Sequence, residues 1–524
     1  MGAAPFCLLR RWWGPRIDVL GLERSVRRLR GNGCAEGRSP FAGSLRVSLR
    51  YKFSPLLTRK GEMQTRRSAA GTNDNGTGNM VDRNPEAIEY VLREAKENDV
   101  RVIRLWFSDI LGNLKGFATT AEELESGLTR GMGFDGSAIQ GFARSDERDL
   151  YALPDPTTFT VLPLQPHTSA VGRMFCDIIT PAEEPFDGDP RFVLRRNLER
   201  AAKMGFTYYV APEIEYFYFD NAQGTQALDQ GDYFDQDAAD LTTTIRRETV
   251  LTLEELGIPV ESSHHEGAPS QHEIDLRHTD ALTMADTVMT YRLVVKEIAM
   301  RHGHYATFMP KPVAGINGSV MHVHQSLFQG DRNAFFDSEA SDHLSHTARC
   351  FIAGLMRHAR EITAVTNQWV NSYKRLVPDY EAPTHVSWAM VNRSDLIRVP
   401  AYSRGREESR RIEYRAPDPA CNPYLAFSVM LAAGLEGIAQ EYPLPEPLES
   451  NVHDMRDEER RELGIEPLPG SLWEAIQITE DSELVHNALG DYVFRSFIEN
   501  KKIEWERYRL QVTDYEIERY LPLL

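Results

Sequence analysis

The sequence has few of the features that mark membrane or disulfide-bonded proteins. It has no run of about 18 apolar residues, so we expect no transmembrane helix and no membrane partner. Only five of the 524 residues are cysteines, and they form no CxxC pair, which excludes a disulfide framework and favours the reducing cytoplasm. The sequence also lacks a Walker A loop, so a bound nucleotide would be held by metal ions and arginines instead of a glycine cradle.

Acidic residues are scarce at the N-terminus and abundant elsewhere. Residues 1–79 contain 15 Lys/Arg and 5 Asp/Glu, whereas residues 80–524 contain 44 and 72. The basic segment ends in a polar tract rich in Gly, Asn and Thr, and we expect a disordered extension there. There are two alternatives to a disordered extension. The segment could be an organellar transit peptide, or it could be upstream sequence before a true start at Met80. The strongly acidic remainder disfavours nucleic acid as a partner.

A first organised section follows this extension. Asn84 and Pro85 are typical of a helix start, and Val100–Phe107 alternates apolar and polar residues as a strand does. Short strand-like runs continue to about Thr180. Pro181–Asp189 then has the composition of a linker. We therefore divide the chain into residues 1–79, 80–183 and 184–524.

The large last section mixes long helical patterns with short strands. Arg191–Gly205 predicts a helix and Thr207–Asp220 a strand. Longer helical patterns follow at Asp280–His302, His346–Gln368 and Asn422–Gln440. No internal repeat is visible. The predicted fold class is α+β, with helices that cover an antiparallel sheet.

Three strand-like runs carry polar side chains at a two-residue spacing, which places them on one face of each strand. They are Glu213 and Glu215; His322, His324 and Ser326; and Arg411, Glu413 and Arg415. A polar strand face often only meets solvent, but three such faces, with Glu266 and Glu273 in a further segment, weaken that explanation. Several buried carboxylates together require cations. Carboxylates with one histidine suit Mg²⁺ or Mn²⁺ better than Zn²⁺.

Arginines are concentrated in the same part of the chain. They have the chemistry of clamps for phosphate and carboxylate groups. The set consists of Arg375, Arg393, Arg398, Arg411 and Arg415. Metal ligands, arginines and Gly/Asn-rich loops together favour phosphoryl transfer from a nucleoside triphosphate.

Short motifs in a fixed order identify the section from Met80 to Leu524, about 85% of the chain, as similar to a known family. The motifs are FDGS at Phe134–Ser137, PEIEYF at Pro212–Phe217, NGS at Asn317–Ser319, HVH at His322–His324, NSYKRLVP at Asn371–Pro378, YEAP at Tyr380–Pro383, NRS at Asn392–Ser394 and RRIEYRAPDPACNPY at Arg410–Tyr424. Together they resemble the bacterial type I glutamine synthetases, and in particular the secondary glutamine synthetase-like paralogues of actinobacteria.

The resemblance implies a fold and an assembly. It implies a small N-terminal β-grasp domain followed by a large catalytic domain with a curved antiparallel sheet covered by helices. It also implies a homo-oligomer, a dodecamer of two hexameric rings, with active sites between adjacent subunits of a ring.

The resemblance also implies the ligands of the site. ATP and two or three Mg²⁺ or Mn²⁺ ions are the expected cofactors. One metal would be held by Glu215, Glu266 and Glu273, and another by Glu213, His322 and Glu413.

Further residues receive roles from the same motifs. Asn317 and Gly318 would touch glutamate, Arg375 and Arg415 would bind its carboxylates, and Arg393 would lie near the γ-phosphoryl group. Arg398 and Arg411 would hold ATP phosphates, with His324 and Ser326 near the nucleotide. Glu381 would close the site and accept a proton from the amine. Asp135 of a neighbouring subunit would bind ammonium together with Tyr233. Asp149 would order the closing loop.

The implied reaction has two steps. The glutamate γ-carboxylate attacks the γ-phosphorus of ATP, and ammonia then attacks the resulting γ-glutamyl phosphate to form glutamine. Closure of the site matters because water would otherwise hydrolyse the acyl phosphate. Carboxylates such as Asp135 and Glu381 can capture ammonium and make it nucleophilic.

Three departures from the family pattern leave the nucleophile open. Ala138 replaces a serine beside the ammonium site, and Asp379 replaces a glycine of the closing loop. No tyrosine lies between Tyr442 and Tyr492, where adenylylated members carry one. A γ-glutamyl ligase for a polyamine or another primary amine is therefore the alternative function. A non-catalytic structural relative is disfavoured because all six expected metal ligands are present.

Overall fold

The computed structural model describes residues 84–143, 148–163, 170–236 and 241–524. The expectations for the extension at 1–79 and for a start at Met80 lie outside these residues. In the described part, no helix has both the length and the apolar character needed to cross a membrane. Its three cysteines are buried and free.

The predicted helices and strands are confirmed to within a few residues. Asn84 caps the first helix by accepting a hydrogen bond from the Glu86 amide, and Asp280 caps α6 through the Thr283 amide at 3.0 Å. The helices are α2 Pro85–Glu97, α3 Leu124–Arg130, α4 Pro190–Lys203, α5 Leu241–Glu255, α6 Ala281–Arg301, α7 His346–Thr366, α8 Ser372–Arg375, α9 Pro423–Ala439, α10 Asp457–Glu462, α11 Leu472–Glu480, α12 Glu483–Leu489, α13 Asp491–Arg509 and α14 Asp514–Tyr520.

A six-stranded sheet forms the first section of the described chain, in the order β2-β1-β6-β4-β3 with β5 paired to β6. Only β1 and β6 pair in parallel. The alternation around Ile103 and Leu105 buries both side chains completely, and Gly112 turns the chain into β2 with a φ of +78°. The strands are β1 Val100–Ser108, β2 Leu114–Thr120, β3 Met132–Asp135, β4 Asp149–Pro154, β5 Thr160–Leu162 and β6 Ala170–Ile179.

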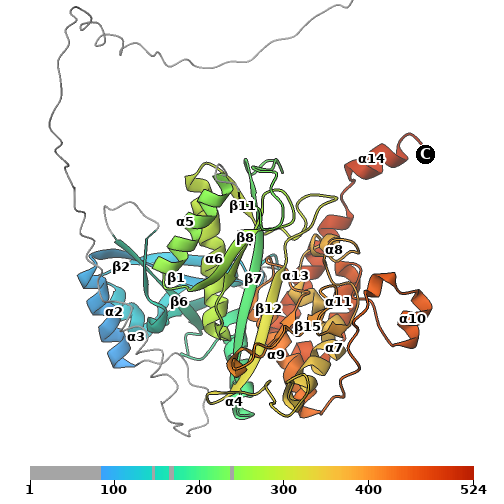
Figure 1. The fold of residues 1–524 in the computed structure, drawn as a ribbon. Coiled ribbons are helices and arrows are strands. Elements are labelled where there is room, and N and C mark those ends of the chain that lie inside the picture. Colours follow the sequence, from blue (N-terminus) through green and yellow to red (C-terminus); the bar gives the residue numbers. More distant parts are fainter. Residues whose placement is uncertain (1–83, 144–147, 164–169, 237–240) are drawn as a thin grey trace, which may run out of the picture. The chain divides into compact units, whose positions relative to one another are not determined.

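A ten-stranded sheet forms the second section, and Figure 1 shows its long strands β7 and β12 running through the large domain. Its main order is β14-β15-β16-β12-β7-β9-β8, and all its pairs are antiparallel except β14 with β15. The strands are β7 Thr207–Phe219, β8 Val260–His265, β9 Gln271–Leu276, β10 Thr279–Asp280, β11 Tyr305–Thr307, β12 Met321–Gln329, β13 Arg332–Asn333, β14 Trp388–Ala389, β15 Ile397–Arg398 and β16 Ile412–Tyr414.

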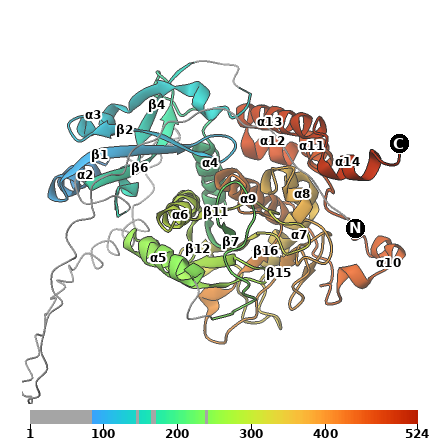
Figure 2. The ribbon, with the colours of Figure 1, turned by 90° about the horizontal axis from the view of Figure 1, so that it is seen from above.

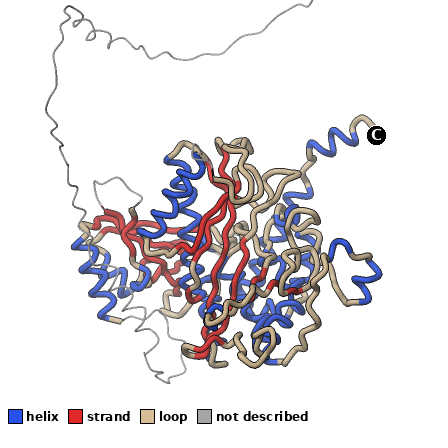
Figure 3. Tube along the Cα trace, in the orientation of Figure 1, coloured by secondary structure: helices blue, strands red, loops and turns tan. Residues whose placement is uncertain are grey.

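Helices cover this sheet, which confirms the predicted α+β architecture. Helices α4 and α6 pack on β7, α5 packs on β8, and α9 packs against α4, α6 and α7. Figures 2 and 3 show the helices gathered around the strands of the large domain. Helix α9 is almost entirely buried, as its apolar sequence predicts.

A buried arginine joins the two sections. Arg191, at the start of α4, donates to Asp155 at 2.9 Å, to Asp177, and to Asp286 at 3.0 and 3.1 Å. Asp155 and Asp177 belong to the first section, whereas Asp286 lies on α6. We call these four residues the Arg191 hub. The hub ties the small sheet to the helices that support the large one.

Candidate active site

Polar side chains from four neighbouring strands meet on one face of the ten-stranded sheet. Glu213 of β7 lies opposite His322 of β12, and Glu215 lies opposite Glu273 of β9. Glu413 of β16 lies opposite His324 on β12. Because strand side chains alternate, Ile214 and Tyr216, the residues that follow Glu213 and Glu215, point into the core, where both are fully buried. The two-residue spacing in the sequence therefore produces a polar face over an apolar support.

Glu213, His322 and Glu413 form the second group of candidate ligands, with ligand atoms all within 4.8 Å of one another. The Nδ1 atom of His322 lies 3.3 Å from Glu213 Oε2 and 3.7 Å from Glu413 Oε1. Burial, and then the charge of Arg415, lower the pKa of His322 to about 4, so its imidazole is neutral at pH 7. A neutral imidazole between two carboxylates is a suitable donor set for a divalent cation.

The second group also contacts protein cations. Glu413 accepts hydrogen bonds from Arg398 Nε at 2.6 Å and from Arg415. Burial alone would raise the pKa of Glu413, but Arg415 and the nearby histidines bring it to about 2. Arg411 Nε donates to His324 Nδ1 at 3.2 Å, and His324 Nε2 lies 2.6 Å from Glu213 Oε1. The structure thus brings Arg398, Arg411 and Arg415 beside the second group, where Arg398 and Arg415 contact Glu413 and Arg411 contacts His324.

Glu215, Glu266 and Glu273, with His264, form the first group. His264 Nδ1 lies 3.3 Å from Glu266 Oε1, and its Nε2 lies 4.0 Å from Glu273 Oε1. In the described chain, no arginine or lysine forms an ion pair with any of the three carboxylates. Burial raises the pKa of all three, and the charge of Glu266 raises that of Glu215 further. Hard oxygen donors with uncompensated charge fit Mg²⁺ or Mn²⁺.

Sequence reasoning missed His264. Its ring stacks on Phe234, with centroids 4.5 Å apart and an interplanar angle of 22°. The signal was available, because His264 stands two residues before Glu266 in a strand-like run. It was overlooked because the family resemblance implies only the carboxylates of this segment, Glu266 and Glu273, as metal ligands.

A further histidine cluster, Asp229, His265 and His272, has a structural explanation. His265 Nδ1 lies 2.6 Å from the Glu266 carbonyl oxygen, and its Nε2 lies 2.9 Å from Asp229 Oδ1. Arg246 donates to His272 Nδ1 at 2.6 Å, which leaves the ring proton of His272 on Nε2, facing Asp229. The ring nitrogen of His272 that faces Asp229 therefore carries a proton and offers no lone pair to a metal. This cluster holds the segment around Asp229 against β8 and β9.

The loop that precedes β12 approaches the first group. Asn317 Nδ2 lies 3.4 Å from Glu381 Oε2. A Cβ atom at Gly318 would come within 2.3 Å of the Pro310 carbonyl oxygen and 2.9 Å of Arg375 Cγ, so only glycine fits there. Arg375 is 2% exposed and donates to the carbonyl oxygens of Ala416 and Pro417. The expected glutamate-binding residues Asn317, Gly318 and Arg375 are thus brought together.

Residues 376–383, here called the closing segment, have a strained backbone. Asp379 has a φ of +73° and Glu381 a φ of +55°. Non-glycine residues in the left-handed region cost about 1–3 kcal/mol each, although Asp tolerates the region better than most. The Asp379 that departs from the family's glycine therefore stands where a glycine fits best. The segment must be held in place by contacts elsewhere.

Tyr233 and Arg393 also reach the first group. Tyr233 is half exposed, and its ring centroid lies 5.6 Å from that of His264. Burial raises the pKa of Tyr233, the Glu266 carboxylate raises it further, and a hydrogen bond with Arg393 opposes this. Ser326 lies two residues beyond His324 on β12, opposite Tyr209.

Asp135 and Asp149 belong to the six-stranded sheet instead of the sheet that carries the carboxylates. They lie opposite one another on β3 and β4. Asp135 is exposed and accepts hydrogen bonds from the Ser137 amide and hydroxyl, both at 2.9 Å. This chain alone therefore does not assemble the whole predicted site on one sheet.

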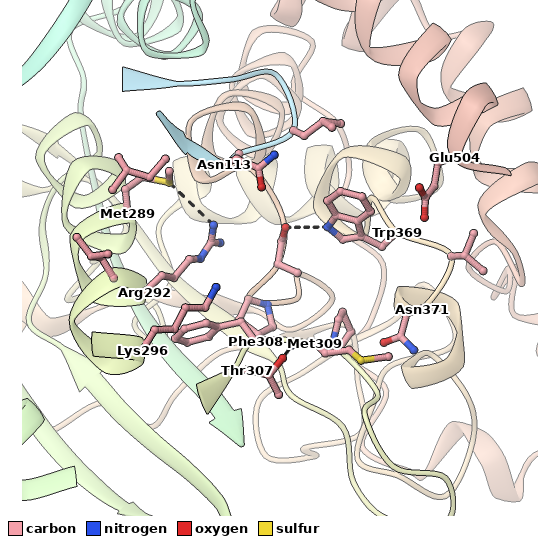
Figure 4. Close-up of a pocket in the computed structure, with 18 of the residues that line it drawn as sticks. Asn113, Met289, Arg292, Lys296, Thr307, Phe308, Met309, Trp369, Asn371 and Glu504 are labelled. Carbon is pink, nitrogen blue, oxygen red and sulfur yellow. Dashed lines mark hydrogen bonds between the residues drawn. The ribbon is translucent and has the colours of Figure 1, made fainter. Parts of the chain in front are cut away.

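A separate cavity of about 740 Å³ lies between the β1–β2 turn, α6, α8 and α13 (Figure 4). Its lining is largely apolar, with Phe308 and Trp369 among the walls. Three cations, Arg292, Lys296 and Lys374, also line it, and among the described residues none of them forms an ion pair with a carboxylate. It is lined by none of the predicted site residues.

Comparisons with known proteins agree with this geometry. Family models for the β-grasp domain and the catalytic domain of glutamine synthetase match residues 99–181 and 187–520. A glutamine synthetase of Mycolicibacterium smegmatis is 53% identical over 443 residues, covering 83% of this chain and 99% of the relative.

More distant relatives match over the same length. Glutamine synthetases of Methanosarcina mazei and Thermotoga maritima are 50% and 46% identical, each over 440 residues and 83% of this chain, covering 98% and 100% of the relatives. A solved structure of GmaS in complex with ADP superposes with a TM-score of 0.75 at 31% identity, covering 82% of this chain and 99% of that one. The chain belongs to the glutamine synthetase family, with its β-grasp domain followed by its catalytic domain.

Proposed function

We propose that the protein is an ATP-dependent glutamate–ammonia ligase that forms glutamine through γ-glutamyl phosphate. The observation that carries the proposal is the polar face of the large sheet, where two carboxylate groups stand beside a set of arginines. Crowded, buried carboxylates without a resident cation are costly in a protein that has no use for them. Glutamine synthetases that match this chain over almost their whole length support the same function.

The two groups would hold divalent cations, two or three Mg²⁺ or Mn²⁺ ions in all. Glu215, Glu266 and Glu273 would hold one, and Glu213, His322 and Glu413 another. Bound there, such cations neutralise charge on the phosphate groups during transfer. His264 would orient Glu266, because its Nδ1 lies 3.3 Å from that carboxylate.

The arginines would bind the anionic ends of both substrates. Arg375 and Arg415 would receive the glutamate carboxylates, with Asn317 and Gly318 against the substrate backbone. Arg398 and Arg411 would hold ATP phosphates, near His324 and Ser326. Arg398 and Arg415 both contact Glu413. When a substrate binds, each arginine would exchange the Glu413 carboxylate for a substrate phosphate or carboxylate. The arginines would therefore have an anionic partner both before and after binding.

The amide-forming step would use residues at the edge of the face. Arg393 would contact the transferred phosphoryl group, and Glu381 would accept a proton from the attacking nitrogen. Asp135 from a neighbouring subunit, with Tyr233, would bind ammonium, and Asp149 would support the closing segment. Asp135 is exposed on the small sheet, which suits a role across a subunit boundary.

A γ-glutamyl ligase for a larger primary amine is the second candidate. The observation that favours it is Ala138, half-buried three residues after Asp135, where the family pattern has serine. A smaller, apolar side chain leaves room for an alkyl group on the nitrogen. The likeness to GmaS, at 31% identity, is compatible with this reading.

We also propose a homo-oligomer, a dodecamer of two hexameric rings. Helix α14 supports it, because Figure 1 shows this helix projecting beside the C-terminus, apart from the other helices. Its apolar side chains are exposed, and it also carries acidic residues. The largely apolar cavity of Figure 4, whose lining has three cations and one carboxylate, Glu504, would be complementary to such a helix from another copy. Removal of residues 511–524 should reduce the assembly mass in analytical ultracentrifugation.

The division into domains 80–183 and 184–524 and a cytoplasmic location complete the proposal. The two sheets support the division, since each is built from strands of one section only. The buried free cysteines are compatible with a reducing compartment.

The decisive experiment measures phosphate release with ATP, glutamate and Mg²⁺, comparing ammonium with a panel of primary amines, and identifies the amide by mass spectrometry. The proposal predicts glutamine as the main product with ammonium. A clear preference for a larger amine would favour the second candidate, and absence of release with every nucleophile would contradict both.

Variants test the ligand assignment. Glu266→Ala and Glu413→Ala should each abolish phosphate release with every amine, since each removes one ligand from one group. Retention of more than about a tenth of the activity would contradict two metal sites. Glu261→Ala is the matched control, because Glu261 is an exposed carboxylate on β8.

A further inference from the structure

Lys311 lies where the loop before β12 meets the closing segment. It is 8% exposed, and its Nζ lies 3.7 Å from the ring centroid of Tyr380, directly over one face. The same ammonium group donates a hydrogen bond to the carbonyl oxygen of Ile316, the residue before Asn317. One side chain therefore contacts two segments that both carry residues of the proposed site.

The backbone of Lys311 is fixed independently of its side chain. Its amide donates to Asn371 Oδ1 at 2.7 Å, and Asn371 Nδ2 donates back to its carbonyl oxygen at 3.0 Å. Asn371 begins the motif that contains α8 and Arg375. The ammonium group is thus presented from a firm base.

Tyr380 lies in the part of the closing segment that needs an external restraint. Its neighbours Asp379 and Glu381 both have left-handed backbone conformations without being glycine. Asp379 and Glu381 are exposed, whereas Tyr380 is half-buried. The contact with Lys311 attaches this strained stretch to the rest of the site, and cations over aromatic faces attract most strongly where water is excluded.

We propose that Lys311 is a positioning residue that clasps Tyr380 and so holds Glu381 over the carboxylate face. The proposal rests on the proposed function and adds to it a cause for closure. When the clasp is open, water reaches γ-glutamyl phosphate. Hydrolysis then breaks the acyl phosphate, returns glutamate and phosphate, and consumes ATP without forming an amide.

The first test measures closure without activity. Glu381 is exposed, and a protease needs a mobile, extended chain, so glutamyl endopeptidase should cleave after Glu381 faster when the closing segment is released; cleavage in α10 at Glu462 is the internal reference. Lys311→Met and Tyr380→Leu should accelerate cleavage at Glu381 about tenfold. Lys311→Arg and Tyr380→Phe keep a cation and a ring, and should stay close to the unmodified protein.

A matched control distinguishes the clasp from the general loss of such a contact. Arg357→Met removes a guanidinium that lies 4.6 Å from the Tyr442 ring centroid, on α7. It should leave cleavage at Glu381 unchanged. Equal cleavage at Glu381 in Lys311→Met, Tyr380→Leu and the unmodified protein would overturn the clasp.

The second test measures the consequence for the reaction. The ratio of phosphate released to amide formed should be near one for the unmodified protein and rise about threefold or more in Lys311→Met and Tyr380→Leu. The double variant should show no larger ratio than Lys311→Met alone, because that change already removes the contact with Tyr380. An unchanged ratio in an active enzyme would overturn the role in closure.

The two tests separate this inference from the proposed function. If the unmodified protein releases no phosphate with any nucleophile, the proposed function is wrong, while the cleavage rates still decide whether the clasp exists. Tyr380→Leu alters a half-buried loop residue and should not prevent folding, so it keeps the test valid if Lys311→Met is unstable.

Discussion

Two buried acidic clusters of this molecule resemble each other in composition and differ in what balances their charge. In the Arg191 hub, three aspartates surround a guanidinium that is 2% exposed. In the first group, three glutamates face one another, and the nearest basic side chain is His264, 3.3 Å from Glu266. The hub carries its own cation, whereas the first group does not.

The pKa shifts follow this difference in part, because burial outweighs Arg191 at Asp286 of the hub and raises its pKa. Burial would raise the pKa of Asp155 in the hub, but the Arg191 guanidinium lowers it below its usual value. In the first group, burial raises the pKa of Glu273, and the charge of Glu215 raises it further. A compensated cluster joins domains, and an uncompensated one is available to bind a cation. The second group, with Arg398 and Arg415 on Glu413, lies between these extremes.

The largest effect is expected for Arg191→Met. Breaking one buried ion pair costs about 3–5 kcal/mol, and this change removes the shared guanidinium from three aspartates at once, although Arg195 still donates to Asp177. Because domains are stable by only about 5–15 kcal/mol, we expect little folded protein, measured as soluble yield and urea midpoint.

Arg195→Met is the control for that change. Arg195 donates to Asp177 at 2.9 Å, but its side chain is 24% exposed. We expect a loss of no more than about 1 kcal/mol. Similar midpoints for both variants would mean that the hub is not a special compensated cluster.

Glu413→Gln is expected to have the next largest effect. Glu413 is 1% exposed, and the change leaves Arg398 and Arg415 without a full charge partner. We expect the free energy of unfolding to fall by about 3 kcal/mol. A rise in stability on this change would contradict the view that protein cations already balance the second group.

Glu273→Gln should do the opposite when a chelator keeps metal away. Removing one of three crowded carboxylates should raise the free energy of unfolding by about 1 kcal/mol, because burial and the charge of Glu215 disfavour the ionised Glu273. Saturation with Mg²⁺ at a hundred times its Kd should stabilise the unmodified protein by about 2.7 kcal/mol and this variant much less. Thermal unfolding with chelator and with Mg²⁺ measures both stabilities. If the variant is less stable than the unmodified protein in chelator, the charge of the first group is already balanced and this view is wrong.

Much of this arrangement follows from local sequence patterns. The two-residue spacing of Glu213 and Glu215 correctly predicts one strand face, since β7 is a regular strand. The long helical periods predict α6, α7 and α9 to within a few residues. Periodicity reports which side of an element a residue occupies, and these elements are regular enough for that to suffice.

Other features depend on partners distant in sequence. Nothing near Arg398 indicates that it faces Glu413, because this depends on the β15–β16 pairing. The Lys311 contact with Tyr380 joins two irregular loops. The metal and substrate roles of all these residues remain predictions until the variants are measured.

Asp189 lies beside the Arg191 hub, and no cation of the described chain fully balances its buried carboxylate, so it makes stability depend on pH. Burial, and then the charge of Asp177, raise the pKa of Asp189 to about 7, although two backbone amides and Arg191 oppose this. The folded state then keeps a proton that the unfolded state releases above about pH 4, so stability falls as pH rises from 4 towards 7. Asp189→Asn keeps the α4 cap and should remove about 2 kcal/mol of this loss of stability between pH 5 and 7. Asp280→Asn, the half-buried α6 cap, is the control; an unchanged slope in Asp189→Asn would place the pH dependence elsewhere.

The smallest effect concerns the exposed carboxylate of Asp135, whose charge is stabilised by water and by neighbouring hydrogen-bond donors. Asp135 already accepts the Ser137 amide and hydroxyl at 2.9 Å, so a second hydroxyl from Ala138→Ser adds little to the charge itself. It would act on a bound ammonium, where one further hydrogen bond to a charged group contributes at least about 1.5 kcal/mol, or about tenfold in affinity. In an ammonia ligase the ammonium KM should fall by that factor and the glutamate KM should not change. In a ligase for larger amines the same variant should raise the KM of the amine, because the hydroxyl occupies the space of an alkyl group. If neither KM changes, position 138 only packs the turn after β3, and the argument for an altered nucleophile loses its structural basis.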